Sequence, residues 1–99
     1  MKRYIALLTF TEKGFASIKD SPARVATFRA SAEAAGVTIN ALYWTTGPYD
    51  GLISFDAPDE MTADALMLDL NATGFVKTQT MRALDDDAFA AVLAKAGQA

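Results

Sequence analysis

The chain has 99 residues, of which 52% are hydrophobic and 21% are charged, and its formal net charge is −3. This length and composition fit one globular domain, 1–99, and exclude a disordered chain, while the sequence pI of about 4.7 argues against a nucleic-acid surface. The absence of cysteine and histidine removes disulfides, thiolate nucleophiles, the commonest general base and the commonest zinc ligand. We therefore expect no cofactor and no metal centre.

The first predicted strand covers 4–10, a nearly continuous apolar run whose length and β-prone residues are typical of a strand buried on both faces. Lys2 and Arg3 precede this run, as basic residues do in a signal peptide. The run is short, however, Glu12 and Lys13 follow it, and it has no small-residue cleavage site. We expect a strand of a cytoplasmic protein, with no segment that spans a membrane.

A long helix is predicted to begin at Ser21 and Pro22 and to end before Gly36, because serine caps free amides and proline suits the first helical position. A shorter helical turn is expected within 11–18, where Gly14 weakens it. The apolar stripe of the long helix consists of Val25, Phe28, Ala32 and Ala35.

Residues 38–45 alternate β-branched, polar and aromatic side chains, which predicts a second strand. Residues 46–49 contain glycine and proline and predict a turn. Residues 50–56 return with an apolar middle, so the two strands are expected to form a hairpin.

A second long helix is predicted to open at 57–60, where a proline fits the first turn and two acidic residues favour the positive end of the helix. Residues 75–84, with a polar middle, predict the fourth strand. The acidic run 85–87 is expected to cap a last helix that reaches Ala96. Three consecutive carboxylates cap a helix more often than they converge on one metal ion.

The resulting order is β-α-β-β-α-β plus a terminal helix, which predicts an α+β, ferredoxin-like split sheet. In this topology the first and third strands are central and the other two are edges. The first and third strands are also the most apolar here, so the local pattern agrees with the topology.

Both faces of the first strand are apolar, since side chains from Tyr4 to Phe10 at even positions point to one face and Ile5 and Leu7 point to the other. The two long helices of this fold cover one face only. A second copy, packed sheet to sheet, would cover the other face and enclose a cavity. The alternative is that the terminal helix, 87–96, folds across it. We favour the homo-oligomer, because one short helix covers only part of a four-stranded sheet.

The predicted hairpin tip holds the best candidate site. A phenol and a carboxylate there can bind a polar ligand or move protons, an aromatic residue can form an apolar wall, and an arginine can contact an anion. The candidate ligand-binding residues are Tyr43, Trp44, Tyr49, Asp50 and Arg82. The structural alternative, which we favour, is that Gly47 supplies an unusual backbone angle, Asp50 bonds to turn amides and Tyr49 packs on a neighbour.

The segment 43–50, with its turn Gly47-Pro48-Tyr49-Asp50, resembles the GYD domain family, which is named for a Gly-x-Tyr-Asp turn. The resemblance extends to residues 4–14, 18–22, 57–60 and 78–83. It implies a ferredoxin-like fold of the dimeric α/β-barrel group and oligomeric assembly. It implies no settled biochemical function, so only Gly47, Tyr49 and Asp50 are carried over, as motif positions without catalytic roles.

Two functions remain open at this point. The favoured one is a non-catalytic homo-oligomeric module that binds a small-molecule ligand or serves as a scaffold for a partner. The alternative is a cofactor-independent isomerase or monooxygenase acting on a small molecule in the cavity between sheets. The enzyme would require the candidate residues to converge on one cavity.

Overall fold

The computed structural model describes residues 1–98, in which four antiparallel strands form one sheet. The strands are β1 (Lys2–Phe10), β2 (Thr38–Trp44), β3 (Gly51–Ala57) and β4 (Val76–Ala83). Their order across the sheet is β2-β3-β1-β4, so the two most apolar strands are central. The predicted α+β ferredoxin-like fold is confirmed.

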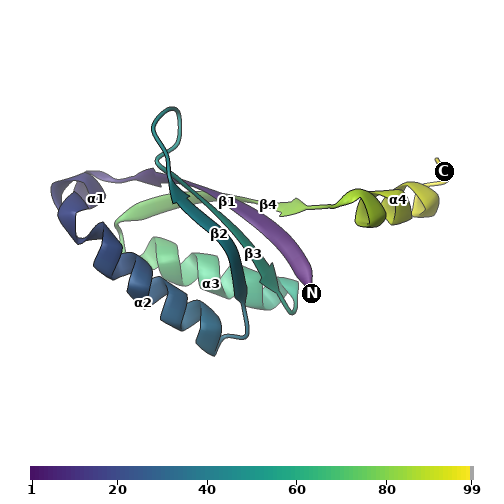
Figure 1. Ribbon diagram of the computed structural model, residues 1–99, viewed down its shortest axis with the longest axis horizontal. Coiled ribbons are helices and arrows are strands. Elements are labelled where there is room, and N and C mark those ends of the chain that lie inside the picture. The colour runs from purple at the N-terminus through teal and green to yellow at the C-terminus, as the bar shows by residue number, and fades with distance from the viewer. Residues whose placement is uncertain (99) are drawn as a thin grey trace.

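The helices α2 (Ser21–Ala34) and α3 (Glu60–Ala72) lie side by side on one face of the sheet (Figure 1). The short helix α1 (Glu12–Ala16) and the 3-10 helix η1 (Ile18–Asp20) connect β1 to α2. No helix within residues 1–98 is long and apolar enough to cross a membrane.

The hydrophobic core fills the layer between the sheet and these two helices. Phe55, in the middle of β3, is fully buried, and its ring stacks on that of Tyr4 with 5.5 Å between centroids. Burial raises the pKa of the Tyr4 hydroxyl, which finds no hydrogen-bond partner within residues 1–98. The core residues are Tyr4, Ala6, Phe28, Ala32, Val37, Ile53, Phe55, Ala57, Ala63, Leu66 and Met67.

The opposite face of the sheet, called here the open face, carries no helix of this chain. The strand register places Leu7 beside Leu52 and Ile5 beside Met81 on this face, and Tyr43 lies next to Leu52. Tyr43 is 62% exposed and Met81 is 47% exposed. The second apolar face that the sequence of β1 predicts is therefore uncovered in the single chain.

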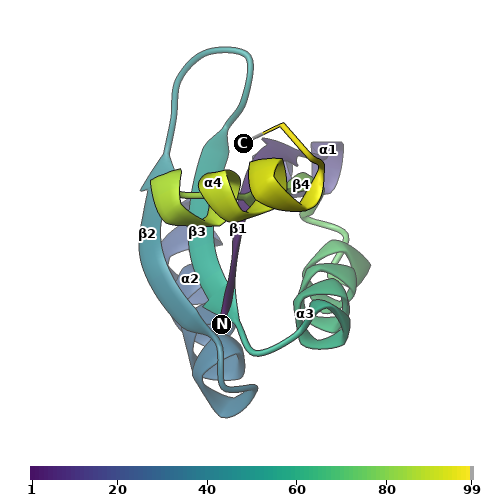
Figure 2. The ribbon, with the colours of Figure 1, turned by 90° about the vertical axis from the view of Figure 1, so that its right-hand side faces the viewer.

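The terminal helix α4 (Asp86–Lys95) projects beyond the end of β4 and does not fold across the open face (Figure 1). None of its residues is buried. Its N-terminus is capped as expected, because Asp85 accepts a hydrogen bond from the Ala88 amide at 2.8 Å. In the end-on view, α4 lies in front of the sheet and the loop between β2 and β3 extends past it (Figure 2).

The segment that enters α1 is fastened to the loop between α3 and β4. The Thr11 hydroxyl donates to the Gly74 carbonyl at 2.6 Å, and the Thr11 amide donates to the Phe75 carbonyl at 3.1 Å. Gly14 is buried against the Phe75 carbonyl oxygen, so closely that a Cβ would overlap it. Glycine is thus required here by close approach, and the contact holds Phe75 near α2.

We expect Gly14→Ala to destabilise the fold by about 1 to 3 kcal/mol, because the added methyl group displaces the Phe75 backbone. Urea denaturation followed by circular dichroism measures the loss. The matched control is Glu12→Ala, which changes an exposed residue of the same helix and should cost less than about 0.5 kcal/mol. Equal midpoints for the two variants would contradict the close contact.

Candidate ligand-binding cleft

An apolar cleft of about 480 Å³ lies between the sheet and the two long helices. The strands contribute Leu8, Leu42 and Ile53, and the helices contribute Phe28, Leu66 and Leu70. On α2, small residues such as Ala23 and Ser31 face the same space, so the helix leaves part of it unfilled. This volume lies in the range of small-molecule sites in proteins.

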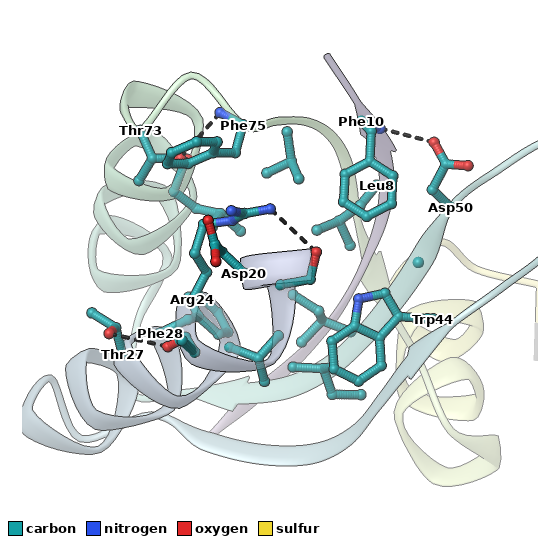
Figure 3. A pocket seen from close by; sticks show the side chains of 18 of the residues that line it. Leu8, Phe10, Asp20, Arg24, Thr27, Phe28, Trp44, Asp50, Thr73 and Phe75 are labelled. Carbon is teal, nitrogen blue, oxygen red and sulfur yellow. Dashed lines mark hydrogen bonds between the residues drawn. The ribbon is translucent and has the colours of Figure 1, made fainter. Parts of the chain in front are cut away.

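Arg24 enters one side of the cleft from α2. Its guanidinium lies over the Phe75 ring, 4.1 Å from the centroid, and donates to the Ser17 carbonyl at 3.0 Å and to the Ser21 hydroxyl at 3.2 Å. Phe10 and Trp44 face it from the other side (Figure 3). A half-buried cation therefore lies against one aromatic ring and faces two others across the cleft.

Ser21 does not cap α2 as its sequence position predicted. The N-cap residue is Asp20, which makes no side-chain cap hydrogen bond, and Ser21 already has helical backbone angles. Its buried hydroxyl instead accepts the hydrogen bond from Arg24. The expected cap is wrong because the preceding 3-10 helix runs directly into α2 and moves the helix start by one residue.

Asp50 joins the β2–β3 hairpin to the end of β1. Its carboxylate Oδ2 accepts a hydrogen bond from the Phe10 amide at 2.8 Å, and its own amide donates to the Leu8 carbonyl at 2.8 Å. The last β1–β3 pair is Leu8 with Gly51, so Asp50 continues the contact between these strands past the regular ladder. The turn before it has Gly47 at φ +147°, a backbone angle that favours glycine.

A Gly-x-Tyr-Asp turn that fastens a hairpin to the central strand agrees with the comparison to known families. The family model for the GYD domain matches residues 4–93. The chain belongs to the GYD domain family. It is also similar to the "Glutamine synthetase and cystathionine beta-lyase binding protein" of Thermus thermophilus. The two are 34% identical over 85 residues, which cover 85% of this chain and 90% of that protein.

Tyr49 of the GYD turn points away from the cleft. Its hydroxyl donates to Gln79 Oε1 of β4 at 3.2 Å, and Gln79 lies beside Leu7 on the open face. The Thr45 hydroxyl closes the turn by donating to the Tyr49 carbonyl at 2.7 Å. Together with the bonds of Asp50, these contacts favour the structural interpretation of the GYD residues.

The five candidate residues of the GYD domain do not meet in one place. Trp44 and Asp50 border the cleft, and Tyr43 is also among its lining residues although its register puts its side chain on the open face. Tyr49 and Arg82 are not among the lining residues. Arg82 pairs with Tyr4, four residues along β1 from Leu8, which is roughly 13 Å of strand. No cluster of three or more potential metal ligands occurs in the described part of the chain, residues 1–98. The five candidate residues therefore do not all border one cavity, as the enzyme hypothesis requires of them.

Two important residues of the cleft, Arg24 and Phe75, were not singled out from the sequence of this GYD domain. The helical pattern places Arg24 beside the apolar stripe of α2, as a solvated residue, and the strand pattern places Phe75 at the start of a strand. Only their spatial proximity reveals the site. Gly14 was the one relevant feature of the sequence, because a glycine in a helical turn can mark a close contact. The helix pattern alone does not predict that the contact is with Phe75.

Replacing Asp50 tests whether its role is structural. We expect Asp50→Ala to lower the free energy of unfolding by about 2 to 3 kcal/mol, because the Phe10 amide loses a charged acceptor, and Asp50→Asn to cost about 1 kcal/mol. Chemical denaturation measures both. Asp69→Asn is the control, since Asp69 also borders the cleft but is exposed on α3. Stability unchanged in Asp50→Ala would rule out this role.

Proposed function

We propose that this GYD domain is a cytoplasmic, non-catalytic binding module that assembles with copies of itself and docks onto a metabolic enzyme. The observation that carries the proposal is its similarity, over 85% of the chain, to a relative named for binding glutamine synthetase and cystathionine beta-lyase. An enzyme of one of these two kinds is therefore the candidate partner. The five candidate ligand-binding residues do not all border one cavity, which favours binding over the enzyme hypothesis.

The open face and α4 support self-association. A helix of ten residues is marginal in water unless it packs against something, and α4 exposes Phe89 to 53% and Val92 to 43%. The open face presents a second uncovered apolar surface that includes Tyr43 and Met81. A second copy of the chain brings its own α4 and its own open face, so one symmetric assembly can bury both apolar surfaces.

Light scattering at micromolar concentration should give a mass at least twice the chain mass of 10.6 kDa. Met81→Glu on the open face and Phe89→Glu on α4 should each shift the mass toward the monomer, because a carboxylate is costly to bury. Met61→Glu, on the outer surface of α3 where the side chain is 81% exposed, is the control and should leave the mass unchanged. A monomeric wild-type chain would reject the assembly.

A second surface suits docking onto an enzyme. A shallow groove of about 630 Å³, called here the end groove, lies beside the GYD turn and is bordered by Phe15, Ile18 and Trp44. All three side chains are more than 45% exposed. Clusters of exposed apolar residues commonly mark protein interaction sites. The end groove includes Phe15 of α1. Helix α4 lies at the opposite end of the molecule from α1, so the two surfaces can be used together (Figure 1).

We expect the purified chain to bind immobilised glutamine synthetase or cystathionine beta-lyase from its own organism, measured by biolayer interferometry. Ile18→Glu should weaken that binding at least tenfold, because it places a charge in the end groove. Leu68→Glu is the matched control, because Leu68 is an apolar residue on α3 that is 71% exposed, against 46% for Ile18, and the change should have little effect. No binding to either enzyme at micromolar concentration would refute the docking proposal.

A further inference from the structure

We propose that the cleft between the sheet and the two long helices binds a small monocarboxylic acid with an apolar body, whose carboxylate pairs with Arg24. The proposed binding of an enzyme uses the end groove and does not require this site. A ligand in this cleft would be bound in addition to the proposed enzyme partner.

The shape and lining of the cleft account for the apolar body of the ligand. Leu8, Leu42 and Ile53 form the side toward the sheet, and Phe28 and Leu70 form the side toward the helices. A chain or ring of about ten carbon atoms fits a cleft of about 480 Å³. Apolar surface removed from water there contributes roughly 25 cal/mol per Å² before the cost of immobilising the ligand.

Arg24 accounts for the carboxylate. It is the only lysine or arginine among the described residues that line the cleft, and the Phe75 ring, Ser17 and Ser21 hold it in place. Within residues 1–98, the only ion pair closer than 4.0 Å joins Arg3 to Asp56, so no carboxylate of the described chain contacts Arg24 within that distance, although Asp20 lies on the same side of the cleft (Figure 3). A positioned, half-buried guanidinium with open donor capacity matches a ligand carboxylate.

Three aspartates also border the cleft and limit what it accepts. Asp20 and Asp69 are exposed, so solvent screens their charges, and the carboxylate of Asp50 is engaged by the Phe10 amide. One anionic group can be matched by Arg24, but a second one would meet these carboxylates. The site should therefore discriminate against dicarboxylic acids, whereas a cationic head group is disfavoured only at Arg24 itself.

The probe for this site is decanoate, added below its micelle-forming concentration and followed by the emission of Trp44, the single tryptophan of the chain, which lines the cleft. We expect a saturable blue shift with one site per chain, because the half-exposed indole loses water. Decyltrimethylammonium, with the same alkyl chain and a positive charge, should bind at least tenfold more weakly. Decanedioate should also bind more weakly than decanoate.

Arg24→Gln should remove the preference for decanoate over decyltrimethylammonium while leaving residual binding of the alkyl chain. Arg29→Gln is the matched control, since it removes the same charge from an exposed position of α2 outside the cleft. Circular dichroism checks that each variant folds. Should Arg24→Gln fail to fold, the comparison of the three decyl compounds on the wild-type chain decides the question.

Equal affinities for decanoate and the alkylammonium, no saturable change in emission, or an unchanged preference in Arg24→Gln would each overturn the proposal. Decanoate that binds only after Phe89→Glu has dissociated the copies would also overturn it, by showing that a second chain occupies the cleft. Failure here leaves the docking result intact, because Ile18→Glu and the immobilised enzymes report on the end groove, of which Ile18 is a part and Arg24 is not.

Discussion

The rest of the structure depends on one constraint: β1 is apolar on both faces, and the two long helices can cover only one of them. The covered face holds Tyr4 and Ala6 in the core, where they are nearly inaccessible to solvent. The other face keeps Ile5 and Leu7 within an uncovered apolar surface. Since α4 extends away from its own sheet, the chain leaves a large apolar area unpaired, and this drives the proposed association with another protein surface (Figure 1).

The space between the covered face and the two long helices is not completely filled by side chains. The same sheet can therefore support the binding of a small molecule as well as association with another protein. Toward the C-terminal end of β1, α2 presents small side chains to the sheet, while aromatic rings gather around the space they leave. The GYD turn contributes by anchoring the hairpin to β1 through Asp50, which keeps Trp44 beside the cleft. The motif residues thus shape the site through backbone position, and the groups that would touch a ligand are their neighbours.

The fold could be predicted from the sequence because the patterns that define it are local: alternating strands, apolar stripes and helix ends, with two β-α-β units that allow few topologies. The cleft could not, because Arg24 and Phe75 are far apart in the chain and meet only through tertiary contacts of Thr11 and Gly14 with the loop before β4. The phenol of Tyr49 and the carboxylate of Asp50 made the hairpin tip the best candidate site in the sequence. Hydrogen bonds from the Phe10 amide and to Gln79 engage those groups in holding the structure together, and side-chain type alone does not reveal such use.

The cleft and the end groove share a wall, since Phe10, Trp44 and Asp50 border both. A ligand that changes the orientation of the Trp44 ring in the cleft would change the surface offered in the end groove. By thermodynamic linkage, a protein docked in the end groove would then alter the affinity of the cleft for its ligand by the same factor. Asp50 is fixed by the hydrogen bond that its carboxylate accepts from the Phe10 amide, whereas Trp44 is half exposed at the end of β2, so Trp44 is the member of this wall through which such a change would pass.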